Sequence, residues 1–151
     1  MKRLIGVIGA RECPTESLKL AYQVGREIAR HGFGLVCGGM KGVMEESARG
    51  CKEEGGLTVG IIPGDDFSQA NPYIDIVIPT GMGIMRNLLV VRAASGLIAI
   101  DGKYGTLSEI AYALQLQKPL VGLNTWDVCA EFIKVQTAEE ALQKLLKQMK
   151  A

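Results

Sequence analysis

Short apolar runs recur along the whole chain, with helical patterns between them, and this alternation restricts the sequence to one class of architecture. Six runs are predicted to be β-strands: Arg3–Gly9, Phe33–Cys37, Leu57–Ile62, Asp75–Ile78, Leu97–Ile100 and Pro119–Leu123. They consist mostly of continuous Val, Ile and Leu, without alternation of apolar and polar side chains. Strands of this kind are covered on both faces. We therefore expect a buried sheet.

The segments between these runs have the spacing of amphipathic helices. One predicted stripe comprises Leu18, Ala21, Tyr22, Gly25, Ile28 and Ala29, and a second comprises Ile110, Ala113, Leu114 and Gln117. Near the end, Thr137-Ala138-Glu139-Glu140 fits a capping box. Repetition of strand and helix implies right-handed crossovers and a parallel sheet with helices on both sides. We predict a single three-layer α/β/α domain, residues 1–151, with a mostly parallel sheet of six to seven strands.

Charge and composition exclude several classes of function. Lys and Arg number 17 against 16 Asp and Glu, and this balance argues against a general nucleic-acid binder. Aromatic residues make up only 5% of the chain, which argues against recognition by base stacking. The four cysteines form no C-x-x-C pair and His31 is the single histidine, so no metal site is predicted.

Targeting signals are absent from the sequence pattern. The chain opens with Met1-Lys2-Arg3 and passes directly into the first apolar run, without the pattern of a signal peptide. No apolar run reaches the roughly 18 residues of a membrane-spanning helix. We expect a cytoplasmic protein that does not contact a membrane, with Cys37 and Cys129 as inert thiols.

Glycine is over-represented, and the positions of the glycines are informative. Nineteen of the 151 residues are glycine, whereas an ordinary chain has about 7%. Nine of them lie at predicted strand ends: Gly9, Gly38, Gly39, Gly42, Gly64, Gly81, Gly83, Gly102 and Gly105. Ligands of parallel sheets bind outside the carboxyl ends of the strands. Our interpretation is a ligand site in which backbone amides contribute more than side chains.

The loop after the second predicted strand is one candidate for binding a phosphate. Gly38, Gly39 and Gly42 precede a helix, where free backbone N–H groups can face an anion. The alternative is that these glycines serve only a tight turn. The fourth predicted strand leads through Gly81 to Arg86, which falls in the first turn of a helix. A cation there opposes the helix dipole unless an anion lies nearby.

The loop after the fifth predicted strand is the second candidate. Gly102 and Gly105 bracket a turn, and Thr106 occupies the predicted N-cap of the next helix, a position that favours an anion. Glu109 then has two interpretations: a functional carboxylate, or the capping-box partner of Thr106. Asp65 and Asp66 follow the third strand, and they fit turn formers better than magnesium ligands.

Familiar motifs do not explain these loops. Gly6-Val7-Ile8-Gly9 lacks the G-x-G-x-x-G turn of dinucleotide-binding proteins. Gly102-Lys103 lacks the earlier glycine of a P-loop, and Tyr104 stands where a P-loop has Ser or Thr. With one histidine, no Ser/His/Asp arrangement is convincing.

Two segments resemble a known superfamily, that of the Lonely Guy (LOG) proteins and the molybdenum-cofactor carrier proteins. Its signature is an arginine at the start of one helix and P-G-G-x-G-T-x-x-E at the start of the next. The segments Thr80–Arg86 and Asp101–Glu109 match this pattern in order and spacing. Gly38–Met44 resembles the other glycine loop of the superfamily, and Gly122–Trp126 resembles its carrier-like branch.

The resemblance implies a Rossmann-like, cytosolic homo-oligomer, a dimer or tetramer, that binds a phosphorylated nucleoside or a pterin ligand. LOG enzymes hydrolyse the N-glycosidic bond of cytokinin riboside 5′-monophosphates. Carried over residue by residue, Arg86 and Glu109 would be the catalytic pair. The ligand's phosphate and nucleoside would be held by Gly9, Gly38, Gly39, Gly42, Gly81, Gly102, Lys103, Gly105 and Thr106. The apolar run Leu88–Val91 is a candidate face for contact between subunits.

This sequence departs from the LOG pattern at three positions. Asp101 replaces the proline of the motif, Lys103 replaces a glycine, and Asn87 replaces the lysine that follows the arginine in LOG enzymes. If position 103 needs a positive φ, the lysine is strained; if not, its ammonium can contact a phosphate. Met85-Arg86-Asn87, together with the segment Gly122–Trp126, favours the carrier-like branch.

Three hypotheses follow. The leading one is a carrier-like protein that binds a nucleotide or the molybdenum cofactor as its ligand and requires no cofactor of its own. The alternative is a nucleoside 5′-monophosphate phosphoribohydrolase, and the third is a purely structural module. Some proteins with this motif have been labelled lysine decarboxylases, but nothing in the sequence suggests a pyridoxal-phosphate site.

Overall fold

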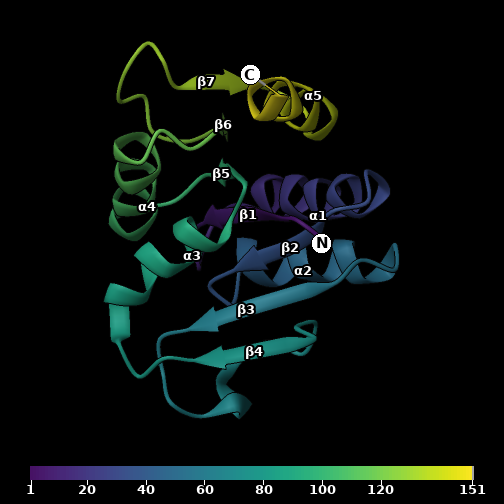
Figure 1. Cartoon of the computed structure of the whole chain (residues 1–151), viewed down its shortest axis with the longest axis vertical. Helices are drawn as coiled ribbons and strands as arrows, with labels where there is room; N and C mark the ends of the chain where they lie inside the picture. Colours follow the sequence, from purple (N-terminus) through teal and green to yellow (C-terminus); the bar gives the residue numbers. More distant parts are fainter. Residues whose placement is uncertain (151) are drawn as a thin grey trace.

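The computed structural model describes residues 1–150 and contains one seven-stranded sheet in which every pairing is parallel (Figure 1). The strands are β1 (Leu4–Gly9), β2 (Gly34–Cys37), β3 (Thr58–Ile62), β4 (Ile76–Pro79), β5 (Gly96–Ile100), β6 (Leu120–Leu123) and β7 (Ile133–Val135). Their order across the sheet is β4-β3-β2-β1-β5-β6-β7. The α/β class and Rossmann-like arrangement are therefore confirmed, with a sheet that is wholly parallel.

Five α-helices cover the two faces of the sheet. Figure 1 shows α1 (Thr15–Arg30), α2 (Val43–Glu53) and α5 (Ala138–Lys150) on one side, and α3 (Asn87–Ala93) and α4 (Tyr104–Gln115) on the other. Each side has its own apolar core, one including Ile28 and Leu142, the other Val91 and Ile110. Two short 3₁₀ helices, η1 (Phe67–Gln69) and η2 (Gly83–Arg86), lie in the loops on either side of β4.

The six predicted strands are all present, with ends that differ by one residue or less. The seventh strand, β7, was not predicted because it has only three residues and buries only Val135, so it makes no apolar run. At the opposite edge, β4 leaves Ile76 and Ile78 exposed, which corrects the expectation that every strand is covered on both faces.

The helices follow their sequence patterns with local corrections. The predicted cap of the last helix is confirmed, since the backbone N–H of Glu140 donates to Thr137 Oγ1 at 3.2 Å. In contrast, α4 ends at Gln115, so Gln117 lies outside its stripe, with a φ of 53°. Val90 and Val91 are fully buried in the core, so they are not available as a face between subunits. No helix within residues 1–150 has the length and apolar character needed to cross a bilayer.

The topology determines where a ligand site is expected. The chain builds β1, β2, β3 and β4 outward in one direction and then returns to place β5 on the other side of β1. At this reversal the loops after β1 and β5 diverge to opposite faces of the sheet. A crevice opens between such loops at the carboxyl ends of the strands.

Candidate functional site

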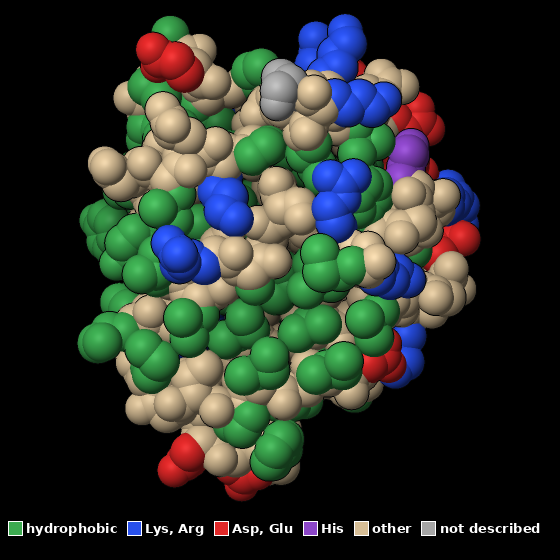
Figure 2. Space-filling view, viewed as in Figure 1, with side chains coloured by type: hydrophobic (Ala, Val, Ile, Leu, Met, Phe, Trp, Pro, Cys, Tyr) green, Lys and Arg blue, Asp and Glu red, His purple; other side chains and the backbone are tan. Residues whose placement is uncertain are grey.

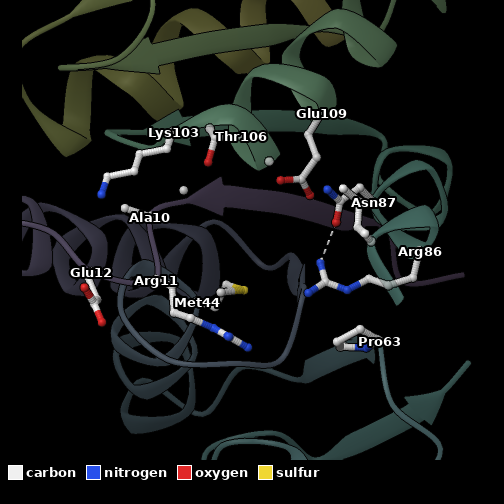
Figure 3. A pocket seen from close by; sticks show the side chains of 13 residues that line it. Ala10, Arg11, Glu12, Met44, Pro63, Arg86, Asn87, Lys103, Thr106 and Glu109 are labelled. Atoms are coloured by element: carbon white, nitrogen blue, oxygen red, sulfur yellow. Dashed lines mark hydrogen bonds between the residues drawn. The ribbon is translucent and has the colours of Figure 1, made fainter. Parts of the chain in front are cut away.

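A cleft of about 440 Å³ lies at the carboxyl ends of β1 and β5 (Figure 3). Its walls come from the loop after β1, the first turns of α4, the start of α2, the end of β3, and the junction of η2 with α3. The lining residues are Gly9, Ala10, Arg11, Glu12, Met44, Pro63, Ile84, Arg86, Asn87, Lys103, Gly105, Thr106 and Glu109. The two residues that the resemblance marks as catalytic, Arg86 and Glu109, are thus brought together with the predicted Gly9, Lys103, Gly105 and Thr106.

Arg86 is the last residue of η2, directly before α3, and its side chain is only 9% exposed. Its Nη1 donates to Asn87 Oδ1 at 2.8 Å, while its buried Nε has no acceptor among the residues described. Burial lowers the pKa of the guanidinium, and the nearby Glu109 opposes this shift. An arginine held in this way has hydrogen-bonding capacity that its own protein does not satisfy, and such capacity costs stability unless a ligand or water uses it.

Gly38 makes room for this arginine. A Cβ at position 38 would lie 2.5 Å from Arg86 Nη1 and 2.8 Å from Met44 Sδ. Gly38 therefore does not line the cleft but supports the guanidinium from behind. The sequence indicates this position as part of the site, and the structure places it one layer further from the cleft.

Glu109 projects from the second turn of α4 into the same cleft and is 6% exposed (Figure 3). Burial raises the pKa of its carboxyl group to about 8, although the charge of Arg86 lowers it in part. The side chain is therefore mostly protonated at neutral pH. Within residues 1–150 no ion pair joins it to Arg86. A protonated carboxyl group can donate a hydrogen bond to a ligand.

The capping-box interpretation of Glu109 is wrong. The helix α4 begins at Tyr104, its N-cap is Lys103, and no side chain caps it. Thr106 is the third helical residue and is buried, so it is not the N-cap that the spacing predicts. The helix begins three residues earlier than expected, because Gly102 with a φ of 105° turns the chain before Lys103.

The loop between β5 and α4 is held by side chains from two other segments. Asp101 has a φ of 54°, a strained value for a residue with a Cβ. Its carboxylate accepts hydrogen bonds from Ser17 Oγ at 2.8 Å and from the backbone N–H of Gly102 at 2.7 Å. From the loop after β6, Thr125 Oγ1 donates to the carbonyl of Asp101 at 2.6 Å, and Trp126 Nε1 donates to that of Lys103 at 3.0 Å.

The backbone conformation of Lys103 shows whether the lysine is strained at this position. Its φ is −112°, an ordinary value, so the lysine that replaces the family's glycine is not strained. The positive φ occurs instead at Asp101 and Gly102. In Figure 3 the Lys103 side chain lies along the rim of the cleft, on the same side as Thr106.

The charges of the cleft favour an anion. Three lining residues are cations, Arg11, Arg86 and Lys103, and two are acids, Glu12 and Glu109. Since Glu109 is mostly protonated at neutral pH, the positive charges exceed the negative ones. The first-turn N–H groups of α4 lie at the same cleft and carry the positive end of the helix dipole.

Five predicted glycines do not line the cleft: Gly38, Gly39, Gly42, Gly81 and Gly102. Gly39, Gly42, Gly81 and Gly102 have a positive φ. Gly42 also allows a close approach, because a Cβ there would lie 2.3 Å from the carbonyl oxygens of both Ala10 and Arg11. These glycines shape the loops that surround the site, so the interpretation that backbone amides dominate the binding is supported only for Gly9 and Gly105.

Several lining residues were missed from the sequence. Arg11 and Glu12 follow β1 at its carboxyl end, where the topology rule alone would have suggested them. Ile84 and Pro63 have apolar side chains without a functional group, so nothing in their chemistry indicates a binding site. Cys37 is buried, and burial raises the pKa of its thiol to about 12, so it is an inert thiol. Asp66 accepts a hydrogen bond from the backbone N–H of Ser68, as a turn former does.

The fold and the cleft place the molecule among Rossmann-like proteins with a crevice at the switch point of the sheet. More specifically, the sequence profile of the SLOG cluster4 family matches residues 2–151, and the chain belongs to this family. An uncharacterized protein of Archaeoglobus fulgidus is 45% identical over 91% of both chains. A cytokinin riboside 5′-monophosphate phosphoribohydrolase of Mycobacterium tuberculosis is a more distant relative, 32% identical over 74% of this chain and 64% of its own length.

Solved structures of molybdenum-cofactor proteins are similar over the whole chain. The molybdenum cofactor binding protein of Rippkaea orientalis superposes with a TM-score of 0.92 at 34% identity, covering 100% of this chain and 99% of the other. The molybdenum cofactor carrier protein of Chlamydomonas reinhardtii gives a TM-score of 0.91 at 31% identity, covering 100% of both chains. The resemblance to this superfamily is confirmed.

Proposed function

We propose that the cleft binds a phosphorylated nucleoside or a molybdopterin-type ligand, and that the protein acts as a cytoplasmic, carrier-like binding protein. The observation that carries the proposal is Arg86, a buried guanidinium that lines a cleft with an excess of positive charge and whose Nε has no hydrogen-bond partner within residues 1–150. An arginine of this kind orients phosphate or carboxylate groups through its planar fork. The similarity to two molybdenum-cofactor proteins over the whole chain supports the same ligand class.

Each group of the cleft has a distinct role in this proposal. The N–H groups of Gly105 and Thr106 and the ammonium of Lys103 hold the phosphate at the start of α4. From the opposite wall of the cleft, the guanidinium of Arg86 balances the remaining negative charge of the ligand. Glu109, in its protonated form, donates a hydrogen bond to an acceptor on the sugar or ring. The cofactor would be cargo here, bound and released unchanged.

Ligand-dependent thermal stabilisation tests the proposal. AMP, GMP and a molybdopterin-type compound would each be added to the folded protein, and at least one should raise Tm in a concentration-dependent way. A folded protein that none of these compounds stabilises would contradict the proposal. Adenosine and guanosine serve as controls, because removing the phosphate should remove most of the stabilisation.

The alternative function is a nucleoside 5′-monophosphate phosphoribohydrolase. It is favoured by the juxtaposition of Arg86 and Glu109 and by the 32% identity to a phosphoribohydrolase. In this reaction water adds to C1′ of the ribose, the C–N bond to the base breaks, and the base leaves with a proton. A carboxylate can stabilise the positive charge that develops on the sugar.

The pH profile of base release distinguishes the two functions. Only the ionised form of Glu109 can stabilise a cationic sugar, and its pKa is raised to about 8. A hydrolase would therefore release base at a rate that rises with pH, reaches half of its limiting value near pH 8 and levels off above it, and Glu109→Gln would abolish that release. Binding of AMP or GMP without release of base at any pH would exclude the alternative.

A further inference from the structure

A second hollow adjoins the cleft at the carboxyl edge of the sheet. It has a volume of about 490 Å³ and is lined by Arg11, Met40, Lys41, Glu45, Ser68, Gln69, Ala70, Asn71 and Pro72. These residues come from the loop after β1, the β2–α2 region and the segment that includes η1. Arg11 is the one lining residue that the hollow shares with the cleft, so the two spaces meet at this side chain.

The walls of the hollow are fixed to each other. The backbone N–H of Asn71 donates to the carbonyl of Gly39 at 2.9 Å, and Asn71 Nδ2 donates to the carbonyl of Met40 at 2.8 Å. Asn71 Oδ1 accepts from the backbone N–H of Tyr73 at 3.0 Å, and the side chain is buried. The two loops that form the hollow are therefore held in place before any ligand binds, as expected of a preformed site.

The backbone at Arg11 is also held in place by the β2–α2 loop. The backbone N–H of Val43 donates to the carbonyl of Ala10 at 2.9 Å, and the φ of Gly42 is 70°. This geometry brings the β2–α2 loop directly against the carbonyls of Ala10 and Arg11. The Arg11 side chain is exposed and makes no ion pair within residues 1–150. In Figure 3 it extends past Met44 toward the part of the cleft that holds Pro63 and Arg86.

The chemistry of the hollow differs from that of the cleft. Met40, Ala70 and Pro72 supply apolar surface for a flat ring. Arg11 and Lys41 supply two positive charges at its rim, against the single carboxylate of Glu45. An arginine between two spaces can contact the oxygens of a diphosphate with its planar fork.

We infer that the cleft and this hollow together bind a dinucleotide, with its diphosphate passing over Arg11 and its second nucleoside in the hollow. This inference rests on the proposed function, because the first nucleotide occupies the cleft. It adds a second subsite and names the ligand as a two-nucleoside diphosphate instead of a mononucleotide.

Calorimetric titration of two matched ligand pairs tests the inference. The pairs are AMP with P1,P2-di(adenosine-5′) diphosphate, and GMP with the corresponding guanosine compound. In at least one pair the dinucleotide should bind at least tenfold more tightly. Ala70→Trp fills the hollow and should remove this advantage, while leaving the mononucleotide affinity unchanged because Ala70 does not line the cleft. Lys41→Glu, at an exposed position that tolerates substitution, should reduce the advantage in the same direction.

The outcomes separate this inference from the proposed function. A protein that binds a mononucleotide as tightly as its dinucleotide overturns the second subsite and leaves the proposed function standing. An advantage that survives both Ala70→Trp and Lys41→Glu also overturns it. If neither member of either pair binds and no molybdopterin-type compound stabilises the protein, the proposed function fails, and the inference fails with it.

Discussion

Glu109 illustrates at the scale of one residue how burial sets the chemistry of the site. Its carboxyl group is buried, with the side chain only 6% exposed, and the nearby Arg86 does not form an ion pair with it within residues 1–150. Desolvation therefore dominates, and the folded protein holds a proton that the unfolded chain releases. The sequence spacing indicates a capping role for this residue, because [ST]-x-x-[DE] is a common helix start. Only the true start of α4, at Tyr104, excludes that role.

The stability of the protein should fall as the pH rises from about 5 to 8, in part because of Glu109. Its pKa is about 8 in the folded state, so folded chains bind more protons than unfolded ones in this range, and deprotonation favours unfolding. Glu109→Gln should remove this component. The free energy of unfolding of the variant, relative to that of the wild type, should therefore be a few kcal/mol higher at pH 9 than at pH 5, on the order of one kcal/mol per unit of pKa shift. Urea denaturation at pH 5, 7 and 9 measures it. A constant difference between the two proteins across this range would show that Glu109 does not titrate as described.

At the scale of elements, the loop between β5 and α4 depends on segments far away in the sequence. Ser17 of α1 bonds to Asp101, and Thr125 and Trp126 after β6 bond to the carbonyls of Asp101 and Lys103. Such contacts link positions that are 84, 24 and 23 residues apart. Helical and strand periodicity describes only neighbours within one element, so these bonds could not be predicted from the sequence.

Thr125→Val and Trp126→Phe should weaken ligand binding more than they weaken the fold. Thr125→Val keeps the shape of the side chain, and Trp126→Phe keeps an aromatic ring of smaller size. Each removes one hydrogen bond, at a cost of roughly 0.5–1.5 kcal/mol. The first turn of α4 then loses part of its support, and affinity for a phosphorylated ligand should fall about three- to tenfold. Thr58→Val is the control for reduced stability alone. It removes the hydrogen bonds that Thr58 Oγ1 makes to the carbonyl of Tyr73 at 2.6 Å and with Asp75, at the other end of the sheet and away from the cleft. Equal loss of affinity in all three variants would indicate a general effect of reduced stability.

The strands could be predicted because burial on two faces leaves a continuous apolar run, as in Leu97–Ile100. β7 could not, since two of its three residues are exposed.

The glycine surplus shows that composition alone does not reveal what each glycine does. Gly25 lies where a Cβ would be 1.9 Å from the carbonyl oxygen of Ser47, so this glycine permits the close packing of α1 on α2. Part of the surplus therefore reflects packing, and part reflects the loops around the cleft.

At the scale of the whole molecule, one edge carries exposed apolar side chains that a monomer would leave in water. They are Phe67, Ile76, Ile78, Met82, Ile84 and Met85, and they surround the unpaired edge of β4 and the turn of η2. Figure 2 shows hydrophobic side chains gathered over the part of the molecule where β3 and β4 lie. Exposed apolar patches beside an open sheet edge are typical of protein contacts.

We predict that this edge is the contact between copies of the chain in a dimer or tetramer. Ile78→Lys and Met85→Asp should each reduce the molecular mass measured by light scattering, because a charge would have to be buried in the contact. Ile133→Asp, at the opposite edge of the sheet and 39% exposed, is the control and should leave the mass unchanged. A wild-type protein that is monomeric at micromolar concentration would refute the prediction.

The most direct test of the proposed site is the dissociation constant of the stabilising nucleotide or pterin ligand, measured by calorimetry for the wild type, Arg86→Ala and Arg92→Ala. Arg92 lies on α3 close to Arg86 in sequence, but it is exposed and does not line the cleft. Binding should weaken at least tenfold in Arg86→Ala and remain unchanged in Arg92→Ala. Arg86→Lys, which keeps the charge without the planar fork, should fall between them. A dissociation constant that is the same for the wild type and a folded Arg86→Ala would contradict the assignment of this cleft as the ligand site.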